Sequence, residues 1–128
     1  MRILVTGTKW TKTEKDALAK ALASAKNKYG DELTIVTGYT APSVAMAFEA
    51  ESKGITTVIF APDLNLVPTK VYELSVNITI TSLDKLGCQK QMVSTCDSTI
   101  ALSDNDPVVL EAMAQGKRVW FPISGKVT

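Results

Sequence analysis

The sequence predicts an α/β fold: one Rossmann-like domain over residues 1–128, with a mostly parallel sheet flanked by helices. Short apolar runs that are typical of buried strands alternate with helical stretches, an order that favours a parallel sheet. Two of these runs, 2–7 and 33–38, end in glycine, which suits a sharp turn into a helix. A length of 128 residues with 45% hydrophobic residues matches one domain with a full core.

The first half of the chain contains three buried strands and two helices. The strands are expected at 2–7, 33–38 and 55–63. The first helix begins near Thr11, which has the spacing of a capping box with Glu14, and Thr13 is the alternative cap. This helix ends near Gly30, and a second helix follows over 41–54. The side chains expected to face the core are Leu18, Ala21, Leu22 and Ala25 in the first helix, and Val44, Ala47 and Phe48 in the second.

The second half differs in character because residues 71–80 alternate strictly between apolar and polar side chains. This pattern predicts a strand with one wet face, at an edge of the sheet or in an antiparallel hairpin. Its apolar side would consist of Tyr72, Leu74, Val76, Ile78 and Ile80. The remaining elements are expected to be a helix at 83–95, a buried strand at 97–103, a helix at 106–115 and a strand at 118–123. Asp106 is the predicted N-cap of the last helix, with Pro107 as its first residue.

Composition argues against several classes of function. The chain has 14 basic and 13 acidic residues, so it lacks the basic surplus of a nucleic-acid binding protein. No apolar run reaches the length of a membrane span, and the N-terminal segment does not match a signal peptide, so we expect a cytoplasmic protein with no membrane partner. The chain has no histidine, which excludes Ser–His and Cys–His nucleophile pairs within one chain. Cys88 and Cys96 are expected to be reduced thiols packed in the core rather than metal ligands, and we expect neither a metal nor a cofactor.

Polar loops follow the predicted strands at the carboxyl edge of the sheet, where ligands bind in folds of this kind. After the first strand, Gly7 permits close approach, Thr8 and Lys9 can donate to a phosphate, and Trp10 can stack on a base or pack in the core, the latter being slightly favoured. Two further loops are expected to contact a ligand. After the second strand the contacting residues are Gly38, Tyr39, Thr40 and Ser43. Before the last helix they are Ser103, Asp104, Asn105 and Asp106.

Acidic residues at the last helix raise a specific question. Helix N-termini bind anions through free N–H groups, yet Asp104 and Asp106 place carboxylates there. An N-cap carboxylate satisfies the same N–H groups that a phosphate would, which explains Asp106 without a ligand. The best-placed candidate catalytic acids are Glu111, one turn into the helix, and Asp104, although the helical pattern favours a solvated Glu111.

The order of these motifs resembles the SLOG superfamily, which includes YspA-like domains, the Lonely Guy phosphoribohydrolases and the core domain of the DNA-processing protein DprA. "MRILVTGTKW" is similar to the YspA-like opening, with Thr8 and Lys9 in place of Ser and Arg. "TIVTGYTAPSVAMAFEAESKGI" is similar to the second strand, loop and helix, with Tyr39 in place of a glycine. "CQKQMVSTCDSTIALS" matches the family at Met92 and Asp97 only. "LEAMAQGKRVWFPISG" resembles the ending of DprA-like members.

The family's anion loop, Gly-Gly-x-Gly-Thr, would fall at "SDND" and is missing. The resemblance as a whole implies a protein that binds a nucleotide or nucleotide-derived molecule, and the missing loop favours a sensor or sequestering module over a phosphoribohydrolase. One alternative is an enzyme that cleaves or transfers an N-glycosidic bond, using Glu111 or Asp104 as nucleophile or to stabilise the oxocarbenium ion. A second alternative is an interaction protein, with DNA binding by analogy to DprA. The alternating strand could also serve as a self-association edge, and we expect a homo-oligomer, a dimer being the simplest case.

Overall fold

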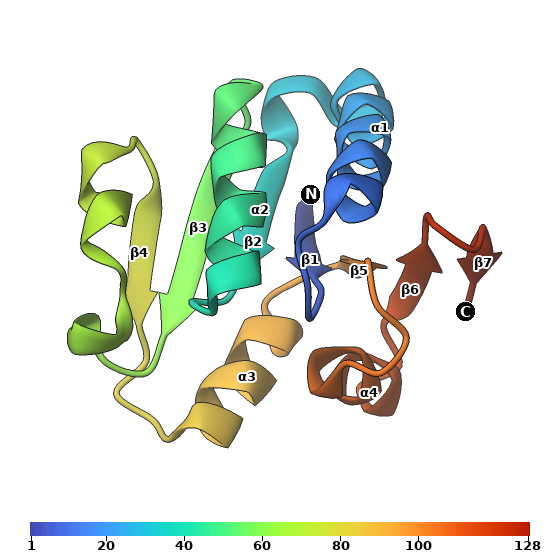
Figure 1. The fold of residues 1–128 in the computed structure, drawn as a ribbon. Helices are drawn as coiled ribbons and strands as arrows, with labels where there is room; N and C mark the ends of the chain where they lie inside the picture. The colour runs from blue at the N-terminus through green and yellow to red at the C-terminus, as the bar shows by residue number, and fades with distance from the viewer.

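The computed structural model describes all 128 residues, which build a seven-stranded sheet with helices on both faces (Figure 1). The strands are β1 (Arg2–Thr6), β2 (Thr34–Thr37), β3 (Thr56–Ala61), β4 (Asn77–Ile80), β5 (Ser98–Ala101), β6 (Arg118–Phe121) and β7 (Lys126–Val127). The α-helices are α1 (Lys12–Tyr29), α2 (Ala41–Ser52), α3 (Lys85–Ser94) and α4 (Pro107–Ala114). The short 3₁₀ helices are η1 (Gly30–Glu32), η2 (Leu64–Leu66) and η3 (Thr69–Glu73). None of the helices combines the length and the apolar character that a membrane span requires.

The strand order β4-β3-β2-β1-β5-β6-β7 places β1 near the middle of the sheet. All neighbouring pairs from β4 to β6 are parallel, and only β6 and β7 pair antiparallel. The chain moves outward from β1 to β4 and then returns to the other side of β1 as β5. The strand order therefore reverses between β1 and β5, and the loops after these two strands diverge there, which is where such sheets bind ligands.

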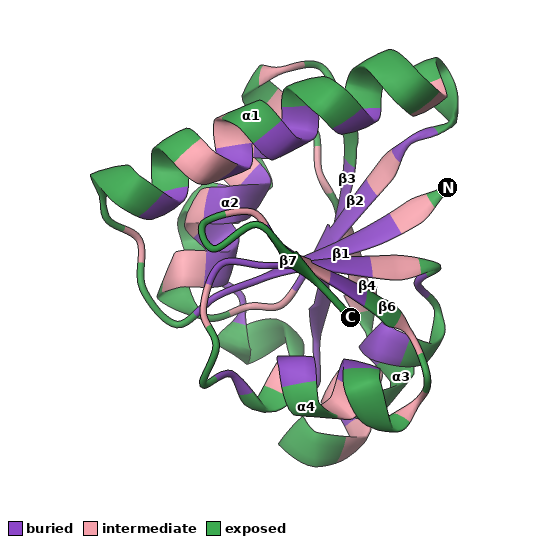
Figure 2. Cartoon of the chain, turned by 90° about the vertical axis from the view of Figure 1, so that its right-hand side faces the viewer, coloured by how far each residue is buried: buried purple, intermediate pink, exposed green.

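The helices form two layers, with α1 and α2 on one face of the sheet and α3 and α4 on the other (Figure 2). Side chains of β1 alternate between the layers: Ile3 and Val5 pack with α1, whereas Leu4 packs with α3 and α4. The predicted core positions of α1 are all buried. In α2 the predicted Val44 and Ala47 are fully buried. The predicted α/β class with a mostly parallel sheet is thus confirmed.

The predicted strand at 71–80 is wrong over its first six residues. Residues Thr69–Glu73 form η3, and only Asn77–Ile80 form β4. Val71 is completely buried in a cluster with side chains of α2 and β3, whereas Tyr72 is 53% exposed, which reverses the predicted alternation. Burial of Val71 in this apolar cluster outweighs a local period-two pattern, because strand propensity depends strongly on tertiary packing.

The predicted edge position of this segment is confirmed, but its predicted antiparallel alternative is not. β4 is the last strand at one edge and pairs parallel with β3, with Ile59 opposite Ile78. The antiparallel strand lies at the other edge and is β7, a strand of two residues that the sequence pattern did not reveal. This difference matters for the site, because a parallel β4 brings the start of α3 to the carboxyl edge of the sheet.

Both cysteines are buried free thiols, as expected for reduced cysteines packed in the core. Cys88 lies in α3 and Cys96 lies between α3 and β5. Burial raises the pKa of each thiol. The two groups therefore stay protonated at neutral pH, which makes them weak nucleophiles.

Thr99 provides a test of core energetics, because its hydroxyl is buried on β5 without a hydrogen-bond partner. It pairs in register with Leu4 and Val119, both members of the apolar cluster beneath α3 and α4. We expect Thr99→Val to raise the free energy of unfolding by about 1 kcal/mol, since it removes an unsatisfied polar group at nearly constant shape. Urea denaturation measures this change.

Thr57→Val is the matched control for that experiment. Thr57 is equally buried on β3, but its hydroxyl donates to the Ile55 carbonyl at 2.9 Å. The same substitution should lower the free energy of unfolding here by roughly 0.5–1.5 kcal/mol. Equal signs at the two positions would contradict the assignment of Thr99 as the unsatisfied group.

Candidate functional site

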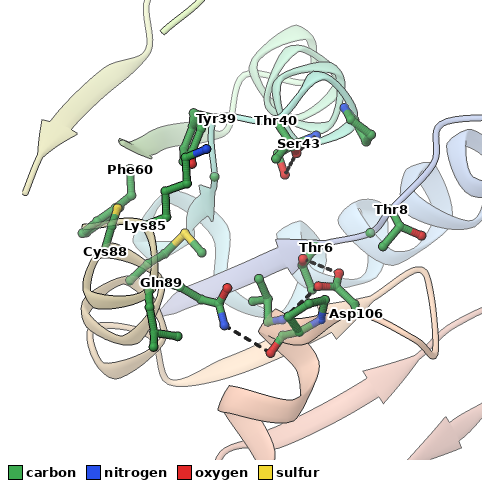
Figure 3. A pocket seen from close by; sticks show the side chains of 17 residues that line it. Thr6, Thr8, Tyr39, Thr40, Ser43, Phe60, Lys85, Cys88, Gln89 and Asp106 are labelled. Carbon is green, nitrogen blue, oxygen red and sulfur yellow. Dashed lines mark hydrogen bonds between the residues drawn. The ribbon is translucent and has the colours of Figure 1, made fainter. Parts of the chain in front are cut away.

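A cavity of about 520 Å³ lies at the carboxyl ends of β1, β2 and β3 (Figure 3). Its walls are the loops after β1 and β2 together with the first turns of α2, α3 and α4. The lining residues are Thr6, Gly7, Thr8, Gly38, Tyr39, Thr40, Pro42, Ser43, Phe60, Lys85, Leu86, Cys88, Gln89, Met92, Asp106, Pro107 and Val108. The volume falls in the range of small-molecule sites, which is about 300–1,000 Å³.

The loop after β1 is joined to the loop after β5 across the switch point of the sheet. The backbone N–H of Thr8 donates to the Ser103 hydroxyl at 3.1 Å, and the Thr8 hydroxyl lies at the same distance from that oxygen. A Cβ atom on Gly7 would lie 2.8 Å from Met46 and 3.2 Å from Leu102. A side chain at position 7 would therefore crowd Met46 and Leu102, so packing favours glycine here in addition to the ligand approach that the sequence predicted.

Two predicted ligand residues of this loop lie outside the cavity lining. Trp10 packs against the apolar cluster beneath α1, in keeping with the core role favoured from sequence. Lys9 is exposed, and its charge is close enough to Glu14 to affect that carboxylate. The capping box of Thr11 and Glu14 is present, and the Thr11 N–H donates to Glu14 at 2.8 Å. The hydrogen bond from the Thr11 hydroxyl is the main cause of the lowered pKa of Glu14.

All four predicted residues of the loop after β2 line the cavity. The Thr40 side chain caps α2 by accepting from the Ser43 N–H at 3.3 Å, and the two hydroxyls are 2.9 Å apart. A Cβ atom on Gly38 would meet Ser43 and Met92 at ordinary contact distances, so this cavity-lining position has room for a Cβ. Burial raises the pKa of Tyr39, whose hydroxyl is therefore neutral at physiological pH.

Asp106 answers the question that its sequence position raised. Its carboxylate accepts from the Val108 N–H at 2.9 Å, which caps α4, and from the Thr6 hydroxyl at 2.6 Å (Figure 3). The residue is only 4% exposed, yet it lines the cavity. The cap is therefore built into the protein, and it also ties the end of β1 to the start of α4.

The other acidic candidates lie apart from the cavity lining. Asp104 borders a separate small cavity of about 70 Å³, together with Phe121 and Ser124. Asn105 is exposed, and neither Asn105 nor Ser103 is a lining residue of the large cavity. The Glu111 carboxylate accepts from the Gln115 side chain at 3.0 Å, one turn further along α4, and Glu111 does not line the cavity either.

The first turns of α3 form a wall of the cavity that the sequence analysis missed. Lys85, Leu86, Cys88, Gln89 and Met92 all line it. The sequence predicted α3 as a helix. It left open an antiparallel strand before α3, and such a strand would place the start of α3 at the amino ends of the parallel strands, away from the cavity. The Gln89 side chain also donates to the Pro107 carbonyl at 3.2 Å, which joins α3 to α4 below the cavity.

The cavity divides into an apolar side and a polar side (Figure 3). Tyr39, Phe60 and Cys88 lie on one side, where Lys85 is the one charged residue, and Thr6, Thr8 and Asp106 lie on the other. No group of three or more cysteine, aspartate or glutamate residues in the structure has the arrangement of a metal site. The arrangement can hold a flat apolar group at one side and hydrogen-bond donors at the other.

Comparison with known proteins shows the fold. No family model matches the sequence, and no curated protein matches it. The structure is similar to the X-ray structure of DNA processing protein A (DprA) from Streptococcus pneumoniae, with a TM-score of 0.67 and 16% sequence identity. The match covers 94% of this chain but 49% of that chain, so this chain spans about half the length of that protein. The likeness supports the predicted relation to DprA at the level of the fold and does not select a subfamily.

The capping box at the start of α1 predicts a pH dependence of stability. A carboxylate whose pKa is lowered on folding stabilises the protein above its unfolded pKa, and this contribution is lost as the pH falls through the folded value. The ordinary value is 4.5, and Glu14 lies below it in the folded protein. We expect Glu14→Gln, which preserves the capping pattern, to narrow the stability difference between pH 6 and pH 3. Urea denaturation at both pH values measures it, and an unchanged difference would contradict the assignment.

The double role of Asp106 predicts a larger loss of stability than that of an ordinary cap. We expect Asp106→Ala to lower the free energy of unfolding by about 2–3 kcal/mol, because it removes the cap and leaves the Thr6 hydroxyl unpaired. Asp84→Ala is the matched control, since Asp84 caps α3 through the Gly87 N–H from an exposed position. That variant should lose about 1 kcal/mol. Equal losses in thermal or urea denaturation would show that the Thr6 bond contributes nothing.

Proposed function

We propose that this protein binds a nucleotide or a nucleotide-derived small molecule in the large cavity, as a sensor or sequestering module. The observation that carries the proposal is the position of the cavity. It lies at the carboxyl ends of three parallel strands, beside the point where the strand order reverses. The loop after β1, with Gly7 and Thr8, and the loop after β2, with Gly38 and Thr40, both line it. Folds of this kind bind nucleotides and related molecules at that position.

The two sides of the cavity fit the two halves of a nucleoside. Phe60, Tyr39 and Met92 provide an apolar and aromatic surface for a base, which packs favourably on such groups. Thr6, Thr8 and Asp106 provide hydroxyl and carboxylate oxygens for sugar hydroxyls. This division supports a ligand that is flat and apolar at one end and rich in hydrogen-bond donors at the other.

The cavity lining does not include the acid on which the enzyme alternative depends. Glu111 is held by Gln115 outside the lining, and the one lining carboxylate, Asp106, is engaged as a helix cap. Binding without turnover is therefore the proposed activity. Base release that disappears in Glu111→Gln would instead identify the N-glycosidase or transferase alternative. Salt-dependent binding of oligonucleotides would identify the DNA-binding alternative.

Filling the cavity from Gly38 tests the proposal. A Cβ atom fits at this position, with Ser43 as its nearest neighbour at 3.7 Å, so Gly38→Leu should fold and project its side chain into the cavity. Gly38→Ala is the matched control, because it adds only the Cβ. We expect ribonucleosides and their 5′-phosphates, measured by isothermal titration calorimetry, to bind the native protein and Gly38→Ala. Gly38→Leu should lose at least tenfold in affinity.

Two results would contradict the proposal. One is the absence of binding by every nucleoside and nucleotide tested. The other is binding that Gly38→Leu leaves unchanged, which would place the ligand elsewhere. Thermal denaturation of both variants without ligand separates a blocked cavity from a loss of folding. Native mass spectrometry of the purified protein provides an independent check, because a retained ligand appears as added mass.

A further inference from the structure

The acidic residue of the cavity is buried without a cation beside it. Asp106 is 4% exposed and lines the cavity, and it forms no salt bridge. The one lysine of the lining, Lys85, lies on the opposite side of the cavity, with Tyr39 and Phe60 (Figure 3). A buried carboxylate is costly unless a cation or hydrogen bonds compensate its charge. Asp106 therefore depends on hydrogen bonds alone.

The protein donates two hydrogen bonds to this carboxylate, one to each oxygen. The Val108 N–H donates to Oδ1 at 2.9 Å, and the Thr6 hydroxyl donates to Oδ2 at 2.6 Å. A carboxylate accepts at about four positions, which are shared equally between its two oxygens. The chain itself therefore uses one position on each oxygen of Asp106, and each oxygen can still accept one more hydrogen bond.

Thr6 and Thr8 complete the hydrogen-bonding character of this side of the cavity. A hydroxyl has a single proton, and that of Thr6 is directed to Asp106, so the Thr6 oxygen can only accept from a ligand. The Thr8 hydroxyl lies 3.1 Å from the Ser103 hydroxyl and can donate or accept. A ligand hydroxyl suits such a surface, because it can donate to Asp106 and accept from Thr8 at the same time.

We infer that the polar side of the cavity binds a cis-diol, so that the ligand is a ribonucleoside or ribonucleotide rather than its deoxyribose counterpart. This inference rests on the proposed function and deepens it. The 2′- and 3′-hydroxyls of ribose lie side by side on one face of the sugar, as the two oxygens of a carboxylate lie side by side. Each hydroxyl donates to one oxygen of Asp106, at the position that the chain itself does not use. The base then lies toward Phe60 and Tyr39.

A series of sugar analogues tests the inference on the native protein. Isothermal titration calorimetry compares each of the four ribonucleosides, and its 5′-monophosphate, with the 2′-deoxy, 3′-deoxy and 2′,3′-dideoxy forms. For the base that binds best, loss of either hydroxyl should weaken binding about tenfold, because one hydrogen bond to a charged acceptor is lost. The arabinoside has its 2′-hydroxyl on the opposite face of the sugar, so it should bind as weakly as the 2′-deoxy form.

Asp106→Asn changes the acceptor without removing the cap, because asparagine caps helices about as well as aspartate does. The variant loses the charge and replaces one acceptor oxygen by an NH₂ group. The ratio of the affinities for the ribonucleoside and its 2′,3′-dideoxy form should therefore shrink about tenfold. Asp63→Asn is the matched control, since Asp63 caps η2 through the Asn65 N–H at 2.9 Å and does not line the cavity. It should keep the native ratio.

Thermal denaturation without ligand shows whether Asp106→Asn folds, and the analogue series on the native protein does not depend on this variant. Equal binding of the ribonucleoside and its 2′,3′-dideoxy form to the native protein would overturn the inference and leave the proposed function intact. An arabinoside that binds as tightly as the ribonucleoside, or a folded Asp106→Asn with the native ratio, would do the same. Failure of every nucleoside and nucleotide to bind would overturn both.

Discussion

The buried carboxylate of Asp106 joins the two chain segments that meet where the strand order reverses. One oxygen caps α4 through the Val108 N–H, and the other accepts from Thr6 at the end of β1. The first interaction is local, whereas the second spans a hundred residues of sequence. This side chain therefore ties the wall of the cavity formed by α4 directly to the central strand, beside the Thr8–Ser103 hydrogen bond that joins the loops after β1 and β5.

This arrangement also explains how the fold exists without a glycine-rich anion loop. In a nucleotide-binding sheet a phosphate can satisfy the free N–H groups of the helix after the switch point. Here Asp106 and Pro107 perform that task within the chain, so α4 needs no ligand for its stability. The consequence is a change in chemistry, because the position that usually attracts an anion now presents an acceptor. The lysine that lines the cavity, Lys85, stands instead at the start of α3.

Local signals in the sequence predicted the four helices, most of the strands and the caps of α1 and α4, and long-range pairing decided the rest. The capping box of Thr11 and Glu14 and the pair Asp106–Pro107 were recognisable because their partners lie within three residues. The role of α3 was not, since it depends on β4 being parallel to β3, which no local pattern encodes. Val71 shows the same limit: its burial against α2 and β3 overrides the alternating pattern around it. The bond between Thr6 and Asp106 likewise has no signal in a single sequence.

Residues whose features are fully explained by the protein itself give little information about a ligand. Gly7 avoids crowding Met46 and Leu102, and Thr40 caps α2. Gly38 and Lys85 are different, because the first lines the cavity with room for a Cβ atom and the second forms no salt bridge. A glycine next to a cavity and a lone cation at a helix start have no evident role in stability. These two cavity-lining residues are therefore where substitution best separates binding from folding.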